Sequence, residues 1–275
     1  MPELPEVETI KKDLSLKILR KKIRRTAVFD RVIVKTSLKD FAKYLRGNTF
    51  MDIERIGKLL IFSLKEGGRV LLAHLGMTGQ LVYVRAGVAP GKFTRVVIYF
   101  MDGSALFFND IRKFGYLKLA REKDKNAIIA KSFGLDALSS HFTANKLKEF
   151  LRRKKGSSLK AALLDQKLLA GIGNIYADEI CFDAGFLPSR KAGSLSLAEI
   201  RRMYRSIKKV LADAVKNRGT SFRNYVDANG KSGNFSRQLK VYGREGSLCV
   251  KCGRTLIRKI ILAGRGTRYC PHCQK

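Results

Sequence analysis

The chain has 275 residues, 45% of them hydrophobic, so it can form two domains and a small module around a substantial core, which excludes a disordered chain. Its 56 lysine and arginine residues outnumber 23 acidic residues, and the formal net charge of +33 favours a polyanionic partner, above all nucleic acid. We find no apolar run of about 18 residues that could span a membrane, and the start MPELPEVE lacks the pattern of a secretory signal, so we expect a cytoplasmic protein.

The first predicted elements are one helix followed by a region of strands. Apolar residues between positions 4 and 20 recur at spacings of three and four, which predicts an amphipathic helix. From about 25 to 120, short apolar runs alternate with Gly and Asp-Gly turns, which predicts strands in two packed sheets. These runs are VFDRVIV, LLIFSL, VLLAHL, QLVYVR, RVVIYF, ALFFN and YLKLA.

Helices are predicted from about 134 to 218, and a mobile loop rich in Gly, Ser and Asn follows at 219–238. The helical runs are HFTANKLKEFLRR, LKAALLDQKLLAGIGNIYADEICFDAGF and SLAEIRRMYRSIKKVLADAVKN. Ser196, three residues before Glu199, is a candidate helix cap. The sequence therefore predicts a multidomain α+β protein with three segments: a helix plus two-sheet β-sandwich at 1–130, a helical segment with its loop at 131–238, and a cysteine module at 239–275.

Four cysteines near the C-terminus have the spacing of a zinc site. Cys249 and Cys252 form one Cys-x2-Cys pair, and Cys270 and Cys273 form the second. In a reduced compartment, two such pairs joined by a hairpin supply four thiolates to one tetrahedral Zn²⁺, which leaves no open position and makes the ion structural. Four merely buried or redox-active cysteines are the weaker alternative. We expect Cys181 to lie in the core.

Two glycine-containing turns are candidate phosphate contacts. Inside the cysteine module, the turn Ala263-Gly264-Arg265 can project its arginine towards a groove or a phosphate, although a solvated turn also fits. In GIGN, residues 171–174, the glycines precede a helical run, so backbone N–H groups and the Asn174 side chain can approach a phosphate. A simple turn between two helices is the alternative there.

The N-terminus carries groups suited to covalent catalysis. Removal of Met1 would expose Pro2 as a secondary amine, and a pKa of about 8 leaves such an amine partly neutral and nucleophilic at pH 7. Glu3 is adjacent and Glu6 lies one helical turn further on, so two carboxylates are near the amine for proton transfer. By composition alone, an ordinary capped helix is the simpler explanation.

These motifs together resemble those of the bacterial formamidopyrimidine-DNA glycosylase family. The matching stretches occur in the same order along the whole chain: PELPEVETI, LLDQKLLAGIGNIYADE, VYGREGSLCVKCG and GRGTRYCPHCQ. The resemblance implies a DNA glycosylase and AP lyase of base excision repair, which excises 8-oxoguanine and formamidopyrimidines from duplex DNA through a proline Schiff base and then cuts the strand by β,δ-elimination. It also implies a helix-two-turn-helix domain, a lesion-capping loop, a C-terminal β-hairpin zinc finger, and a monomer that acts on the bacterial nucleoid.

The resemblance implies a role for five residues in the reaction. Pro2 is the implied nucleophile, Glu3 the implied proton donor in glycosidic cleavage, and Glu6 its support. Lys58 is the implied proton donor in β-elimination, and Arg265 is implied to bind phosphate and to assist δ-elimination.

A further group of residues is implied to contact DNA. Met77, Arg112 and Phe114 match the family's three void-filling residues, and a thioether, a guanidinium and an aromatic ring suit the space left by an extruded base. The implied phosphate contacts are His74 and Asn174, with Tyr242 as a weaker candidate.

The sequence departs from the family pattern at three places. Phe93, which we retain as a DNA-contact position, and Gly156 stand where the family often has a histidine and a basic residue, so we expect Lys92, Arg95 or Lys155 to substitute for them. The loop sequence SFRNY, residues 221–225, also differs from the commoner family wording.

Two other functions fit part of the sequence. An endonuclease VIII-like enzyme for oxidised pyrimidines would share the architecture and the Pro-Glu start, but PELPEVE, the void-filling residues and the long loop favour purines. A zinc-stapled DNA-binding module without catalysis would retain the charge of +33 but would not need Pro2 and Glu3.

Overall fold

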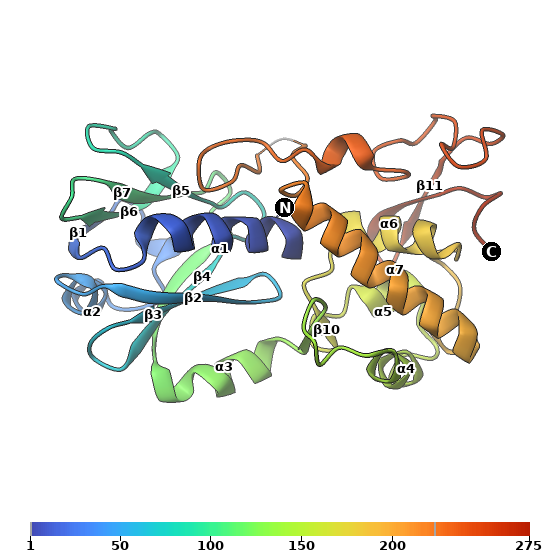
Figure 1. The fold of residues 1–275 in the computed structure, drawn as a ribbon, viewed down its shortest axis with the longest axis horizontal. Coiled ribbons are helices and arrows are strands. Elements are labelled where there is room, and N and C mark those ends of the chain that lie inside the picture. Colours follow the sequence, from blue (N-terminus) through green and yellow to red (C-terminus); the bar gives the residue numbers. More distant parts are fainter. Residues whose placement is uncertain (1, 223) are drawn as a thin grey trace. The chain divides into compact units, whose positions relative to one another are not determined.

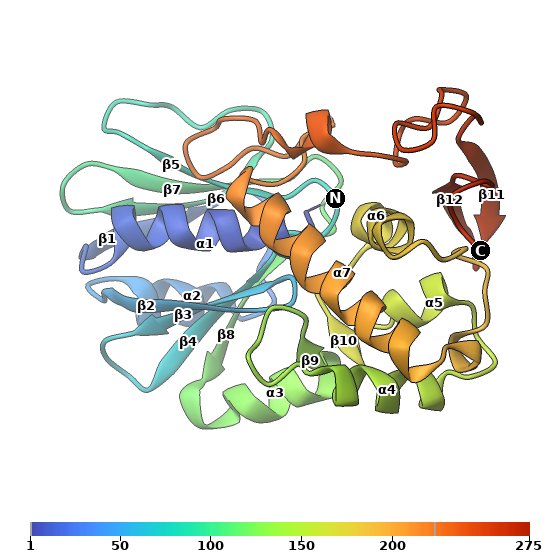
Figure 2. The ribbon, with the colours of Figure 1, turned by 45° about the vertical axis from the view of Figure 1, so that its right-hand side comes forward.

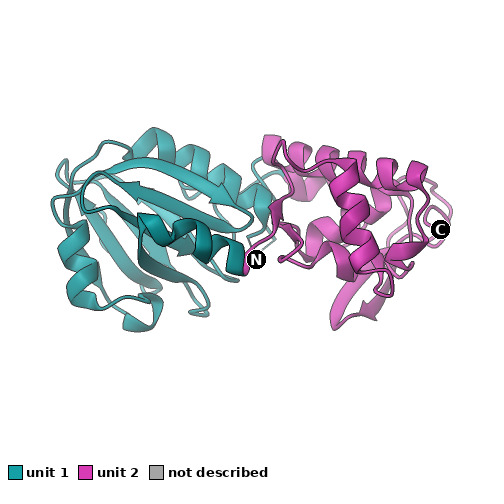
Figure 3. Ribbon diagram, turned by 90° about the horizontal axis from the view of Figure 1, so that it is seen from below, with its two compact units in different colours: residues 1–131, 217–234 teal, residues 132–216, 235–275 magenta. Residues whose placement is uncertain are grey.

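The computed structural model of the protein describes residues 2–222 and 224–275, and the contacts divide the chain into two compact units (Figure 3). Unit 1 comprises residues 1–131 and 217–234, and unit 2 comprises residues 132–216 and 235–275. The segment 217–234, expected from the sequence to accompany the helices, makes its contacts in unit 1. The chain therefore returns to unit 1 once before it ends in unit 2.

Unit 1 is a sandwich of two four-stranded antiparallel sheets, as predicted. One sheet has the order β1-β6-β7-β5, formed by Ile23–Val28, Thr94–Phe100, Ala105–Asn109 and Gln80–Val84. The other has the order β2-β3-β4-β8, formed by Phe50–Ile56, Leu59–Leu64, Arg69–His74 and Tyr116–Arg121. Alternate side chains of both sheets share one apolar core, to which Phe62 and Leu71 contribute from one sheet and Val96 and Ile98 from the other.

Helix α1, Leu4–Ile18, belongs to the same core (Figure 1). Its residues Val7, Ile10 and Leu14 are fully buried, and their spacing of three and four places them on one face. The helix predicted over residues 4–20 is thus confirmed to within two residues. Because this helix starts the chain, its burial fixes the N-terminus against the sandwich.

The run VFDRVIV, residues 28–34, was predicted as a strand, and this is wrong. Strand β1 ends at Val28, and a 3-10 turn spans Arg31–Ile33. The Asp30 carboxylate accepts a hydrogen bond from the Val32 N–H at 3.1 Å, which closes the chain into a turn in place of an extended strand.

A second helix, α2, Leu38–Leu45, lies within the region predicted to contain only strands. Ser37 caps it by accepting a hydrogen bond from the Asp40 N–H, and the helix buries Phe41 and Leu45. With only two buried side chains, its helical period was too short to detect among the surrounding strand patterns.

Unit 2 combines helices, a short parallel strand pair and a C-terminal hairpin (Figure 2). The helices are α4, Ala144–Arg153; α5, Leu159–Leu163; α6, Asn174–Ala184; and α7, Leu197–Lys216, while α3, Lys125–Ser132, spans the boundary between the units. The strands are β9, Leu135–Asp136; β10, Leu169–Ala170; β11, Arg258–Leu262; and β12, Arg265–Tyr269. In the described part of the chain, no helix has both the length and the apolarity needed to cross a membrane.

The long helical run predicted from residue 159 is interrupted. Gln166 closes the interruption, because its side chain accepts from the Gly171 N–H at 3.0 Å and donates to the Ile172 carbonyl at 2.7 Å. The predicted cap of α7 is confirmed: the Ser196 N–H donates to the Glu199 carboxylate at 2.8 Å, and the Glu199 N–H donates to the Ser196 hydroxyl.

Truncation of α1 in the core is expected to destabilise unit 1. Ile10→Ala removes a fully buried side chain and should lower the free energy of unfolding by about 2–5 kcal/mol. Leu16→Ala on the same helix is the matched control, because Leu16 is 89% exposed and its loss should have little effect. Urea unfolding of both variants checks this expectation, and equal stabilities would contradict the packing described for α1.

Candidate active site and nucleic-acid interface

The N-terminus of α1 is buried and is organised by two carboxylates. Glu3 is the N-cap residue, and its N–H donates to Glu6 Oε2 at 2.8 Å, while the Glu3 side chain accepts from the Glu6 N–H in a reciprocal capping box. Pro2, Glu3 and Glu6 are all buried. The structure therefore brings together the three N-terminal residues predicted to carry the chemistry.

Glu6 also holds the segment 217–234. Its Oε1 accepts a hydrogen bond from the Thr220 N–H at 2.7 Å. Gly219 has φ +77°, and a Cβ added there would lie 2.7 Å from Glu6 Oε1, so only glycine allows this approach. The helix end and the predicted capping loop thus meet at one carboxylate, a contact that sequence patterns did not indicate.

Lys58 occupies a tight turn that is tied to α1. Gly57 and Lys58 form the two-residue loop between β2 and β3, with φ +56° at Gly57. Arg55 donates from Nε to Glu8 Oε2 at 2.7 Å and from Nη1 to the Gly57 carbonyl at 3.0 Å. Because Glu8 lies on α1, the same helix orients the Lys58 turn and carries the N-terminal carboxylates.

His74, at the end of β4, is neutral at pH 7 and has a defined tautomer. Burial, together with the nearby charge of Lys58, lowers its pKa to about 4. Its Nδ1 accepts a hydrogen bond from the Gly76 N–H at 3.1 Å, so the proton of the neutral ring is on Nε2. His74 can therefore donate a hydrogen bond to an oxygen such as that of a phosphate.

Met77, Arg112 and Phe114 lie on neighbouring turns that are joined by buried Asp110. The Asp110 carboxylate accepts hydrogen bonds from the Thr78 hydroxyl at 2.5 Å, the Arg112 N–H at 3.2 Å and the Gly115 N–H. Met77 and Phe114 are 37% and 56% exposed, and the Arg112 guanidinium lies 4.6 Å from the centre of the Phe114 ring. Large apolar side chains that are exposed on rigid, hydrogen-bonded turns are suited to insertion between the bases of DNA.

Phe93 is exposed, and its backbone is hydrogen-bonded to Asp110. Its carbonyl accepts from the Asp110 N–H at 2.9 Å, and the Lys92 ammonium lies 5.9 Å from the centre of its ring. Arg95 uses its Nε to donate to the Asp110 carbonyl at 2.8 Å. Of the two expected substitutes near Phe93, Lys92 is therefore better placed to reach a phosphate.

In unit 2, Arg265 is displayed at the tip of the C-terminal hairpin. Ala263 and Gly264 have φ +49° and +70°, and Leu262 pairs with Arg265, which is the geometry of a two-residue hairpin loop. Asn174, the first residue of α6, donates from Nδ2 to the Gly266 carbonyl at 3.2 Å. The two predicted phosphate contacts of this unit are thus linked through a single residue of β12.

A buried ion pair behind this tip was not predicted. Lys160 and Asp178 are 2.7 Å apart and essentially inaccessible, and the Lys160 ammonium also donates to the Gly266 carbonyl and the Thr267 hydroxyl. Asp178 accepts from the Arg268 N–H at 2.9 Å. Burial raises the pKa of Asp178 to about 6, which is still below 7, so the carboxylate remains largely ionised at neutral pH. The sequence did contain a signal for this pair, because Lys160 lies within the apolar run LKAALL and Asp178 within the apolar run IYADEI.

Tyr242 and Lys155 complete the predicted contacts of unit 2. Buried Glu179 accepts from the Tyr242 N–H at 2.9 Å, and the Arg268 guanidinium lies 4.4 Å from the centre of the Tyr242 ring. Lys155 is exposed just after α4, beside an exposed Gly156. The structure thus leaves Lys155 accessible, whereas Tyr242 is held by its backbone and its ring.

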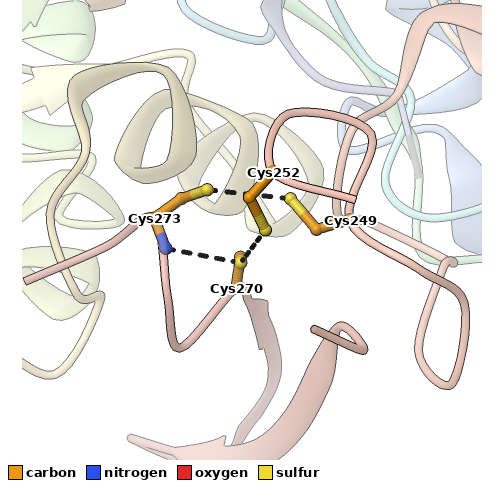
Figure 4. A group of neighbouring side chains, drawn as sticks. All are labelled: Cys249, Cys252, Cys270 and Cys273. Carbon is orange, nitrogen blue, oxygen red and sulfur yellow. Dashed lines mark hydrogen bonds between the residues drawn. The ribbon is translucent and has the colours of Figure 1, made fainter. Parts of the chain in front are cut away.

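The four cysteines of the finger converge as a metal site (Figure 4). All ligand atoms lie within 4.8 Å of one another, and Cys249 to Cys273 and Cys252 to Cys270 are each 3.8 Å between sulfurs. Zn–S bonds of about 2.3 Å in a tetrahedron require S···S distances of about 3.8 Å. The thiols therefore fit one structural Zn²⁺. Cys181 is buried apart from this group, as predicted.

Comparisons with known proteins cover the chain from end to end. Residues 1–117 match the formamidopyrimidine-DNA glycosylase N-terminal domain, residues 133–225 its H2TH domain, and residues 246–275 the zinc finger found in FPG and IleRS. The formamidopyrimidine-DNA glycosylase of Desulfitobacterium hafniense (strain DSM 10664 / DCB-2) is 46% identical over 277 residues, with 100% of each chain covered.

Two solved structures of the Lactococcus lactis protein Fpg are also similar over the full length. Its complex with DNA containing N7-benzyl-Fapy-dG has a TM-score of 0.92, 33% identity and 100% coverage of both chains. Its complex with DNA containing an abasic site has a TM-score of 0.92, 34% identity and 99% coverage of both chains.

The helix-led sandwich, the helical unit and the four-thiol hairpin define a zinc-finger DNA-repair protein with an H2TH domain. The three domain matches and the full-length identity establish that the chain belongs to the formamidopyrimidine-DNA glycosylase family.

Removal of zinc is expected to unfold the finger and abolish DNA binding. The finger's small apolar cluster includes Cys249 and Cys270 themselves, so loss of the metal removes the tie between the two cysteine pairs and leaves only a few apolar contacts in their place. Chelation followed by confirmed metal analysis, circular dichroism and a DNA-binding titration checks this. Full DNA affinity in verified zinc-free protein would contradict it.

Breaking the Lys160–Asp178 pair is expected to destabilise unit 2. Lys160→Met leaves the Asp178 carboxylate buried without its cation and should cost about 3–5 kcal/mol. The double variant Lys160→Met/Asp178→Leu removes that charge and should recover much of the loss. Urea unfolding distinguishes the variants, and a single variant as stable as the wild type would show that the pair is not a stabilising contact.

Proposed function

We infer that this chain is a bifunctional DNA glycosylase and AP lyase of base excision repair, which removes oxidised purines, 8-oxoguanine and formamidopyrimidines, from duplex DNA. The observation that carries this inference is the buried group of Pro2, Glu3 and Glu6 at the start of α1. Full-length similarity to a formamidopyrimidine-DNA glycosylase, and to a protein solved with Fapy-dG DNA and with abasic-site DNA, supports it.

The reaction requires Met1 to be removed, because only then is the Pro2 nitrogen a secondary amine. The amine forms a bond to C1′ of the extruded nucleotide, the glycosidic bond breaks, and the base leaves with a proton. Loss of a proton from the amine and opening of the sugar ring give an iminium ion. Glu3, which the capping box holds next to Pro2 in the chain, is the proposed proton donor, with Glu6 in support.

Strand cleavage follows from the acidity that the iminium gives to the sugar. Loss of a C2′ proton expels the 3′ phosphate in β-elimination, and a further elimination expels the 5′ phosphate. Lys58, fixed by the Arg55 contacts to its turn, is the proposed proton donor in β-elimination. Arg265, at the hairpin tip, is proposed to bind phosphate and to assist δ-elimination.

Base extrusion is assigned to the exposed group on the Asp110 turns. We propose that Met77 and Phe114 fill the vacated space and that Arg112 pairs with the orphaned base. The loop 219–238 is the proposed cap over the extruded purine. Support comes from the contact of this segment with Glu6, which places its root beside the N-terminal group.

The remaining predicted residues are proposed to hold the DNA backbone. His74 and Asn174 are the first of these, and Phe93, Lys155 and Tyr242 the others. A net charge of +33 supplies the nonspecific attraction to which these contacts add.

We further propose three functional segments, one structural zinc and a monomer. The catalytic sandwich is assigned to residues 1–130, the helix-two-turn-helix segment with its loop to 131–238, and the zinc finger to 239–275. The proposed site of action is the nucleoid in the bacterial cytoplasm.

Borohydride trapping on abasic-site DNA tests the proposed function. Wild-type protein should form a covalent adduct with DNA, and the adduct yield should fall with Pro2→Gly, because glycine replaces the ring-constrained secondary amine with a primary amine on a more flexible backbone. Pro90→Gly, at an exposed loop position, is the matched control and should trap as the wild type does. An adduct of undiminished yield with Pro2→Gly, or none with wild type whose Met1 is verified as removed, would overturn the assignment.

A further inference from the structure

Arg218 has a strained backbone at the root of the segment 217–234. Its φ is +62°, and among the described residues only four that are not glycine have a positive φ. Residues with a side chain rarely adopt this left-handed backbone conformation, whereas glycine adopts it without steric cost. A strained arginine directly before Gly219 points to a use for its side chain.

The Arg218 guanidinium joins the segment to α1. Its Nη2 lies 2.5 Å from Asp13 Oδ2 on α1 and 2.5 Å from Asp227 Oδ2 within the segment, and its Nε donates to the same Asp227 oxygen at 3.1 Å. The Asp227 side chain is 1% exposed and that of Asp13 is 10% exposed. The Arg218 side chain is itself 41% exposed, but both of its acceptors are largely buried, and charge-assisted hydrogen bonds of this kind are stronger than neutral ones.

Asp227 connects this ion pair to the later part of the segment. Its Oδ1 accepts from the Asn229 N–H at 2.8 Å and from the Lys231 N–H at 2.9 Å, so its side chain closes a turn. Burial opposes ionisation of Asp227, but the Lys231 N–H and the Arg218 guanidinium more than offset this and lower its pKa. Both halves of the segment are therefore fastened at one ion cluster.

The ion cluster of Arg218, Asp13 and Asp227, which we call the clamp, lies on the same side of α1 as the N-terminal group. Asp13 follows Glu6 by seven residues, which is about two helical turns and returns to the same face. Glu6 holds the Thr220 N–H, and Asp13 holds the Arg218 side chain two residues earlier. Tyr225 is buried in the core of unit 1. The segment is thus anchored at its start, through Arg218 and Thr220, and again further along, at Tyr225.

We propose that Arg218, together with Asp13 and Asp227, is a positioning residue that pre-orders the capping segment for an extruded purine. This inference rests on the proposed function, in which the segment covers the damaged base. A segment already fixed at its root loses less conformational freedom when the segment binds a ligand. The clamp should therefore assist steps that need a captured base and leave steps without a base unaffected.

Two substrates separate these steps. Excision of 8-oxoguanine requires the base to be covered, whereas cleavage at a preformed abasic site has no base to cover. Arg218→Gly removes the guanidinium and relieves the backbone strain, so the variant should fold. We expect its kcat/KM for 8-oxoguanine excision to fall about tenfold and its abasic-site cleavage to stay within about twofold of wild type.

Arg20→Gly is the matched control. Arg20 also lies in unit 1 and has φ +64°, it is exposed, and it makes no side-chain ion pair in the described part of the chain. This variant loses the same charge and the same strain, so both activities should match wild type. Asp13→Asn, which keeps the arginine and the shape of the carboxylate, should reduce excision selectively by a smaller factor and serves if Arg218→Gly does not fold.

The outcomes distinguish the clamp from the proposed function. Selective loss of excision in Arg218→Gly or Asp13→Asn supports the clamp. Equal loss of both activities shows a merely structural role, and unchanged excision shows that the clamp does not position the segment; either overturns the inference. Wild-type protein that cleaves neither substrate overturns the proposed function itself.

Discussion

The buried carboxylate of Glu6 is the contact on which the candidate site depends. One oxygen accepts the N–H of Glu3 and the other accepts the N–H of Thr220, so a single side chain fixes both the start of α1 and the segment 217–234. Both residues are buried, so hydrogen bonds to their backbone groups are costly to lose at this depth. The apolar face of α1 makes this possible, because it anchors the helix between residues of both sheets.

Unit 2 uses buried charge for a similar purpose. The Lys160–Asp178 pair and the Glu179 carboxylate hold backbone groups of β12 and of residues 240–242, and the finger is further organised by its four thiols. A small hairpin with little apolar core cannot define its own tip conformation. Ionic contacts behind the tip and the four-thiol site at the opposite end of the hairpin therefore determine where Arg265 is displayed.

The sequence predicted the parts of the site that depend on spacing. The cysteine pairs, the glycines of GIGN, the helical period of α1 and the capping box at Ser196 are local patterns, and each has the predicted form. What it did not predict are contacts between residues far apart in the chain. The pairing of Glu6 with Thr220 joins residues 214 positions apart, and no local period encodes it. The run VFDRVIV shows a second reason for a wrong prediction. Its β-branched residues favour a strand, but one local hydrogen bond to the Asp30 side chain turns the chain instead.

Asp110 has a consequence for how such a protein can diversify. Its carboxylate accepts hydrogen bonds from a threonine hydroxyl and from backbone N–H groups of the neighbouring turns. None of these donors belongs to the side chain of Met77 or Phe114. The identity of these two protruding residues is thereby uncoupled from the integrity of the scaffold. These two side chains can therefore be exchanged without loss of the hydrogen bonds that hold the turns.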